Sequence, residues 1–196
     1  MKTFATCCAL ILMASLAVAQ ATPPAASSKN PVTDTVRQIF DNQQRNMIAA
    51  ADEMPADKYS FHPTDGQISF AQMMAHVATS NAFLCQRIGD QPAPDSITKV
   101  TKDDGKDKIV AAVKASFDFC AAAVKAVDDS KLADQVDAYR GAKRPRAWAL
   151  IALTNDFADH YSAAAGYLRA AGMLPPSAQR QQQAAPAPAT QKPPQN

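Results

Sequence analysis

The stretch SFAQMMAHVATSNAFLCQRI, residues 69–88, decides the fold of this chain. Its large apolar residues recur at three- and four-residue steps, which is the period of one face of an α-helix. Ser69 and Gln72 stand three residues apart at its start, the spacing of a capping box. The apolar stripe consists of Phe70, Met73, Val77, Leu84 and Ile88. We therefore predict an amphipathic helix that buries one face against other elements.

Three further stretches have the same helical period. They span about residues 30–54, which begin with an asparagine–proline pair suited to a helix start, 106–128 and 145–171. No stretch alternates with period two, so we expect no sheet. Four helices with one apolar face each bury those faces as an all-α, four-helix bundle. The connections 55–68 and 91–104 are longer than a tight bundle needs.

The N-terminus has the composition of a signal peptide. Lys2 gives it a short positive start, residues 7–18 are apolar and uncharged, and small residues ending at Ala19 or Ala21 provide a cleavage site. The apolar run is too short to span a bilayer comfortably, and its two cysteines lie at its start, unlike those of a lipoprotein. The alternative is a buried N-terminal helix. We expect an exported protein, periplasmic or extracellular, with no membrane segment after cleavage.

These features divide the chain into four parts. A signal peptide, residues 1–21, is followed by a linker, 22–30, that is rich in alanine, proline and serine. The helical bundle spans residues 31–176. Proline, glutamine and alanine dominate residues 177–196, which lack the large apolar side chains that offset ordering entropy. We therefore expect a disordered tail.

The charge of the mature part argues against two classes of partner. The formal net charge of the whole chain is +2, and removing Lys2 with the signal leaves +1. This balance provides no electrostatic footprint for nucleic acid or for an anionic membrane surface. The short basic run 143–146 is expected at the N-terminus of a helix. The partner we expect is an unidentified small molecule, and a homodimer stays open.

Cys85 and Cys120 are the two cysteines outside the expected signal peptide. In an oxidising compartment an isolated pair is a candidate disulfide. Such a bond closes a loop of about 35 residues, and in the chain-entropy model it stabilises the fold by roughly 3–4 kcal/mol. The alternative is two buried thiols that behave as small apolar side chains. We expect the disulfide.

Three polar residues on two predicted helices form a candidate metal site. His76 lies beside the apolar stripe of its helix, and Asp156 and His160 stand four residues apart, so they share a helix face. If this pair faces His76 across the bundle, the result is a site with two histidines, one carboxylate and open positions. Such a site suits a divalent transition metal that retains water. The alternative is a solvated pair without a metal.

Several short motifs, in order, resemble the DinB-like (damage-inducible B) superfamily. Before and within the second helix they are Phe-His-Pro at 61–63 and Met-Ala-His-Val-Ala at 74–78. In the last helix they are Asp-His-Tyr at 159–161 and Gly-Tyr-Leu-Arg at 166–169. The exit of that helix adds Gly172, Pro175 and Pro176. The resemblance covers essentially the whole predicted domain and implies a DinB-like four-helix bundle.

A second set of residues resembles an exported branch of the superfamily, in which a signal peptide precedes the bundle and two cysteines face each other. This set comprises Asn81, Phe83, Cys85, Phe117 and Cys120. The resemblance therefore also implies that the two cysteines pair.

The superfamily typically carries three metal-binding histidines, one on the second helix and two, four residues apart, on the last. His76 and His160 match the first and third of these positions, whereas Asp156 stands at the second. Because aspartate also ligates divalent metals, the resemblance implies a divalent transition metal, zinc or nickel. The aspartate in place of the second histidine fits equally well a site that has lost its metal.

Characterised relatives include thiol-dependent transferases and isomerases in which the metal activates a thiol or a water. The resemblance thus implies a metal-dependent transferase or hydrolase of unidentified substrate. Asp159, Tyr161 and Tyr167 are candidates for orienting groups near the metal, and no residue stands out as a general base. The alternative is a non-catalytic bundle that binds a small molecule or a protein, with Asp156 marking a degraded metal site.

Overall fold

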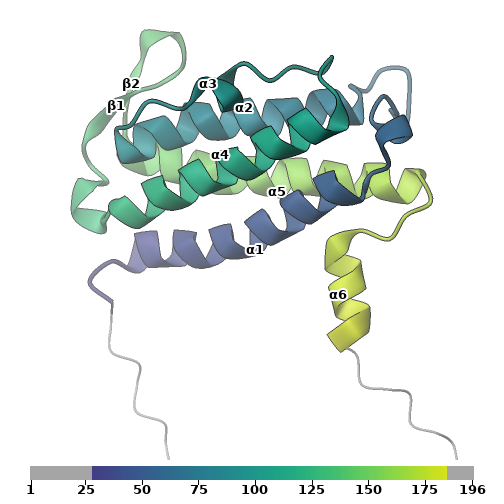
Figure 1. Ribbon diagram of the computed structural model, residues 1–196. Coiled ribbons are helices and arrows are strands. Elements are labelled where there is room, and N and C mark those ends of the chain that lie inside the picture. The colour runs from purple at the N-terminus through teal and green to yellow at the C-terminus, as the bar shows by residue number, and fades with distance from the viewer. Residues whose placement is uncertain (1–27, 185–196) are drawn as a thin grey trace, which may run out of the picture.

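The computed structural model describes residues 28–184. The expected signal peptide, most of the expected linker and residues 185–196 of the expected tail lie outside the described residues. Four long helices lie side by side as a bundle, which confirms the predicted all-α fold (Figure 1). They are α1 (Pro31–Glu53), α2 (Phe70–Gly89), α4 (Lys106–Ala126) and α5 (Arg146–Ala170). Among the described helices, none combines the length and apolarity that crossing a membrane requires.

The helices form a four-cornered arrangement around one core. Both α1 and α2 pack against α4 and α5, so α1 and α2 occupy opposite corners. Phe40 of α1, Phe117 of α4 and Phe157 of α5 meet at the centre, with ring centroids 5.1 to 5.9 Å apart. All three side chains are fully buried. Because each comes from a different helix, this contact ties three corners of the bundle together.

Short elements occupy the long connections. They are η1 (Ala56–Lys58), α3 (Asp95–Thr98), η2 (Asp129–Lys131), β1 (Gln135–Asp137), η3 (Tyr139–Gly141) and β2 (Lys143–Pro145), and a further helix, α6 (Pro176–Ala184), follows α5.

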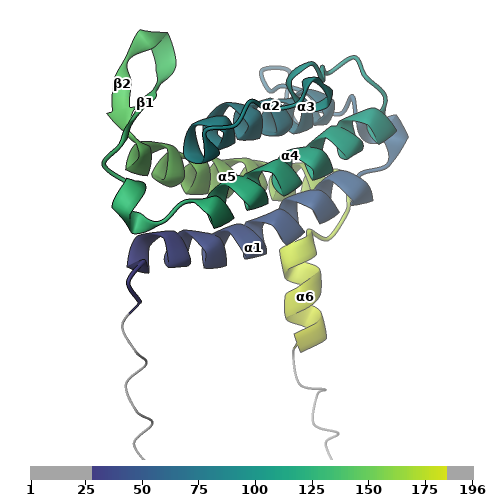
Figure 2. The same cartoon turned by 60° about the vertical axis from the view of Figure 1, so that its left-hand side comes forward.

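The strands β1 and β2 form an antiparallel hairpin that projects beyond the bundle near the end of α2 (Figures 1 and 2). The expectation of no sheet is therefore wrong for these six residues. Strands of three residues are too short to show an alternating pattern. The basic run expected at a helix N-terminus thus forms β2, and only Arg146 begins a helix, α5. At the hairpin tip Arg140 and Gly141 have positive φ values of 58° and 74°, and the amide of Ala142 donates to the Tyr139 carbonyl.

The starts of α1 and α2 are capped in different ways. The Ser69 hydroxyl accepts a hydrogen bond from the Gln72 amide at 3.1 Å, as the spacing predicts. By contrast, the side chain of Asn30 does not cap α1. Instead, the carboxylate of Asp129 accepts hydrogen bonds from the amides of α1 residues 32 and 33, at 3.0 and 2.8 Å. A residue distant in sequence therefore performs the capping.

Residues 177–184 correct the expectation of a disordered tail, because Pro176–Ala184 forms α6 against α1. The helix is held by polar contacts rather than by large apolar side chains. The amide of Ser177 donates to the Tyr161 hydroxyl at 2.9 Å, and the amide group of Gln179 donates to Glu53 at 2.9 Å. Composition alone does not reveal such partners on other helices.

Candidate metal centre

The antiparallel packing of α2 and α5 brings the three candidate ligands together. Arg146, at the start of α5, donates to the carbonyl of Ile88 near the end of α2 at 2.7 Å. The later turns of α5 therefore lie beside the early turns of α2. There His76, Asp156 and His160 each offer a ligand atom, and these atoms lie within 4.8 Å of one another. The two imidazole rings are 4.9 Å apart between centroids.

One ring nitrogen of His160 is already engaged. Its Nδ1 lies 2.8 Å from the backbone carbonyl oxygen of Asp156, one helical turn earlier. In the tautomer with the proton on Nδ1, this contact is a donated hydrogen bond, and Nε2 keeps its lone pair for a metal. The helix thus orients the imidazole as a ligand without help from another element.

The carboxylate of Asp156 is oriented by α2. The Ser80 hydroxyl donates to Oδ2 of Asp156 at 3.0 Å, whereas Oδ1 lies 3.5 Å from Nδ1 of His160 and accepts no hydrogen bond from the described residues. Sequence reasoning missed Ser80. The signal was present, because Ser80 stands four residues after His76 and therefore shares its helix face. Such a partner of a metal-ligating carboxylate fixes its orientation and raises metal affinity.

The site is a surface seam rather than a deep pocket. The side chain of His76 is exposed, whereas those of Asp156 and His160 retain 21% and 16% of their exposure. A recess of about 360 Å³ lies elsewhere, between the end of α2 and β1, and is lined by residues such as Arg87 and Asp137. The three candidate ligands therefore face solvent on one side and leave coordination positions open.

The residues expected to orient groups near the metal have other partners. The Tyr161 hydroxyl accepts the hydrogen bond from α6 described above. The Tyr167 hydroxyl donates to the carbonyl of Ile68 at 2.6 Å, and burial raises the pKa of Tyr167. Asp159 is exposed. Of the sequence-based candidates, the structure therefore brings together His76, Asp156 and His160.

Cys85 and Cys120 are joined by a disulfide that links α2 to α4, with their Cα atoms 5.1 Å apart. Both residues are fully buried. The disulfide lies on a different face of α2 from His76. Helix α2 is therefore bonded covalently to α4 on one face, while another face contributes a candidate ligand beside those of α5.

A comparison with protein families identifies a match to most of the described chain. The family described as the DinB superfamily matches residues 39–164, which is more than half of the chain. The matched range includes all three candidate ligands and both cysteines. No curated protein matches the chain.

Proposed function

The chain belongs to the DinB superfamily, and from this premise we propose that it is an exported protein in which His76, Asp156 and His160 hold a divalent metal. Zinc and nickel are the metals we expect. The proposed activity is that of a metal-dependent hydrolase or transferase. The observation that carries the proposal is the meeting of three ligand atoms within 4.8 Å on two neighbouring helices.

The donor set fits a catalytic metal. Two imidazoles and one carboxylate with a free position are a known ligand set of catalytic zinc. Ligand bonds of about 2.0–2.2 Å place tetrahedral ligand atoms about 3.4 Å apart, so a separation of 4.8 Å must close by about 1.4 Å. The exposed side chain of His76 has the freedom to make this adjustment. Asp156 and His160 are held in place by Ser80 and by the backbone of α5.

When bound, such a metal lowers the pKa of a coordinated water or thiol and creates a nucleophile at neutral pH. The chain's own residues then have three tasks. His76 and His160 supply neutral ligand nitrogens, and Asp156 adds a negative charge that offsets the charge of the cation. The open side admits the substrate. Because export removes the protein from the reducing thiol pool of the cytosol, we favour water over a thiol as the nucleophile.

Two features support export. Residues 1–21 have the composition of a signal peptide. The buried pair Cys85–Cys120 is a disulfide, a bond that persists in oxidising compartments.

A non-catalytic binding protein is the second candidate. It is favoured by the aspartate at a position where the superfamily typically has histidine, and by the openness of the site. Such a protein keeps its fold without metal and binds a small molecule or a protein on the same surface.

The test is the metal content of the purified mature protein by elemental analysis. We expect close to one zinc or nickel ion per chain, lost in His76→Ala and Asp156→Ala. The matched control is Asp159→Ala, which removes an exposed carboxylate of the same helix and should leave the metal in place. Asp156→His, which restores the typical ligand, should also bind. Absence of metal in the wild type, with no thermal shift on adding either ion, would contradict the proposal.

A further inference from the structure

An aromatic cluster joins the hairpin to the seam between α2 and α5. Tyr139, in the hairpin turn, stacks on Phe83 of α2 with centroids 4.4 Å apart and an interplanar angle of 11°. The edge of Trp148 of α5 meets the Tyr139 ring at 5.8 Å. Phe83 and Trp148 are half-buried, but Tyr139 is 58% exposed. We call these three residues the aromatic shelf.

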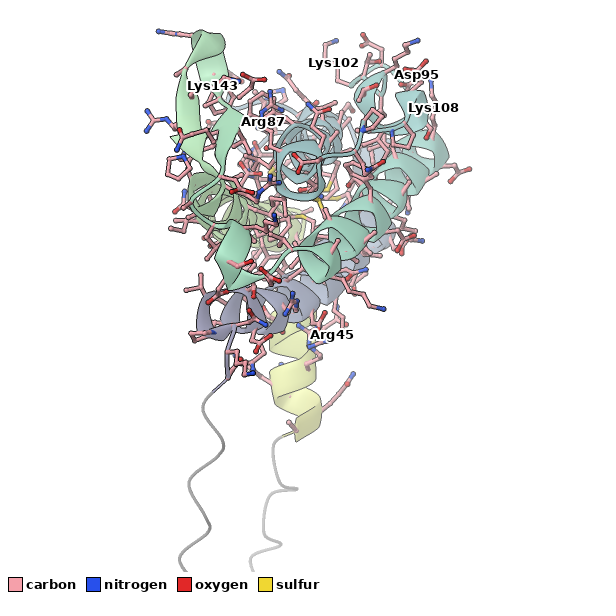
Figure 3. All side chains as sticks on the ribbon, turned by 90° about the vertical axis from the view of Figure 1, so that its left-hand side faces the viewer. Arg45, Arg87, Asp95, Lys102, Lys108 and Lys143 are labelled. Atoms are coloured by element: carbon pink, nitrogen blue, oxygen red, sulfur yellow. A yellow bond between two sulfur atoms is a disulfide. The ribbon has the colours of Figure 1, made fainter. Side chains whose placement is uncertain are left out.

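Two cations of the hairpin, Arg140 and Arg144, have no acidic partner among the described residues, and Arg87 of α2 lies over the Phe83 ring, 3.5 Å from its centroid. The guanidinium of Arg144 lies 5.9 Å from the ring centroid of Trp148. Arg140 lies at the hairpin tip next to Tyr139. Their neighbour Lys143, at the start of β2, is different, because it pairs with Asp137 at 2.5 Å (Lys143 is labelled on the hairpin in Figure 3). Unpaired guanidinium groups near the exposed ring of Tyr139 and the half-buried ring of Trp148 are suited to an anion with an apolar body.

The backbone supports a role for Arg140 beyond folding. Its φ and ψ of 58° and 33° lie in the left-handed region, which is sterically unfavourable for a residue with a side chain. Glycine, asparagine and aspartate are the usual residues at this position of a tight hairpin turn. Gly141, the next residue, follows that rule and Arg140 does not. Arg140 therefore occupies a turn position that disfavours its side chain, and the turn itself gives no reason for an arginine there.

The aromatic shelf lies along the seam that carries the candidate ligands. Phe83 follows His76 by two helical turns, so both lie on one face of α2. On α5, Trp148 precedes Asp156 by eight residues, about 12 Å along the helix axis, with the small Ala152 between them. The candidate ligands are open to solvent and provide little binding area. The affinity for a substrate must therefore come from an adjacent surface.

From these contacts we propose that the aromatic shelf, with Arg140 and Arg144, binds small aromatic carboxylic acids. The ring packs on Tyr139 and Trp148, and the guanidinium groups accept the carboxylate as their counter-ion. The proposal that the aromatic shelf binds such acids depends only on the contacts of the shelf and its two arginines. As the substrate class of the metal centre, it rests on the proposed function.

The chain contains a built-in reporter, because Trp148 is its single tryptophan. We would titrate the full mature protein with 3-phenylpropionate and follow tryptophan fluorescence. We expect a saturable change, with affinity about tenfold weaker for the uncharged 3-phenylpropanol and weaker again for acetate, which lacks the ring. No saturable change with 3-phenylpropionate, or equal affinity for the acid and the alcohol, would overturn the proposal.

Three variants make the test specific. Arg144→Gln should weaken 3-phenylpropionate about tenfold. Arg140→Asn should also weaken it while maintaining or raising the melting temperature, because asparagine suits the turn. Lys143→Gln is the matched control, since it removes a paired cation of the same hairpin and should leave affinity unchanged. Equal losses in all three variants would indicate a general charge effect and contradict the assigned roles.

The same titration on His76→Ala separates this inference from the proposed function. We expect the variant to lose its metal and still bind 3-phenylpropionate. Aromatic acid binding in a wild-type protein without metal would leave the shelf standing and refute the metal centre. A wild-type protein that holds its metal but shows no fluorescence change would support the metal centre and refute the aromatic shelf as a binding site.

Discussion

On its side toward α4, helix α2 is closely packed, whereas on its side toward α5 it presents polar groups to a partly open seam. We call these the closed seam and the open seam. In the closed seam the amide group of Asn81 donates to the Ser116 hydroxyl at 2.9 Å, and the disulfide follows one turn later. A Cβ atom added at Gly89 would lie only 2.9 Å from Cβ of Ala123. At this position the two helices approach too closely for a residue larger than glycine on α2.

The open seam uses polar residues differently. Ser80 holds one oxygen of Asp156, and the carbonyl of Asp156 holds one nitrogen of His160. In each of the two candidate ligands a second atom, Oδ1 of Asp156 or Nε2 of His160, makes no hydrogen bond to the described residues. The difference shows how one helix serves two purposes, since rigid attachment on one face allows loosely packed, chemically available groups on the other.

Breaking the disulfide should have the largest effect on stability. In the Cys85→Ala/Cys120→Ala double variant we expect the free energy of unfolding to fall by roughly 3–4 kcal/mol, because the unfolded chain regains the entropy of an open loop. Denaturant unfolding measures this, with metal content as a second readout that should not change in the folded protein. A reductant should destabilise the wild type and leave the double variant unaffected. Equal destabilisation of the wild type and the double variant by the reductant would show that the disulfide is not the source of this stability.

Gly89→Ala tests the close approach in the closed seam. Because the added methyl group meets Ala123, we expect a loss of about 1–3 kcal/mol in the free energy of unfolding. Gly166→Ala is the matched control in α5, where nothing lies within 4 Å of the added carbon. That variant should gain about 0.5–1 kcal/mol, because alanine favours helix more than glycine does. Thermal unfolding of both variants would reveal the opposite signs, and the same sign in both would contradict the comparison.

Two serine variants sharpen the contrast at the smallest scale. Ser116→Ala leaves the buried amide group of Asn81 without its acceptor, so we expect a loss of about 1–3 kcal/mol in stability with metal binding unchanged. Ser80→Ala removes a contact to a partly exposed carboxylate, so stability should change by less than about 1 kcal/mol. Metal affinity should instead fall about 10–100-fold. Calorimetric titration with zinc measures the metal affinity of each variant, and denaturant unfolding measures its stability. Loss of metal affinity in Ser116→Ala, together with a large loss of stability in Ser80→Ala, would refute these roles.

Short-range features of the fold could be predicted because neighbours in sequence determine them. The cap of α2 is an example, since Ser69 and Gln72 are three residues apart. The start of α1 was predicted, but its cap was not, because the capping carboxylate of Asp129 lies far along the chain. The hairpin was missed for a related reason. Its strands are three residues long and carry no periodic signal.

The candidate ligands could be named from sequence, because Asp156 and His160 have helical spacing and a family resemblance identified His76. Their convergence depends on the antiparallel docking of α2 against α5. Ser80 was within reach of the same spacing argument. The aromatic shelf was not, because Phe83, Tyr139 and Trp148 come from two helices and a turn.

By itself, the sequence determined the four amphipathic helices, the cysteine pair and the chemical types of the candidate ligands, because periodicity and residue chemistry are local properties. Only the tertiary structure decided which face of α2 is attached to α4 and which faces α5. It also decided that the hairpin folds back over Phe83 and that Ser80 orients Asp156. These outcomes depend on how the helices pack around the shared core, and contacts between residues far apart in the chain set that packing.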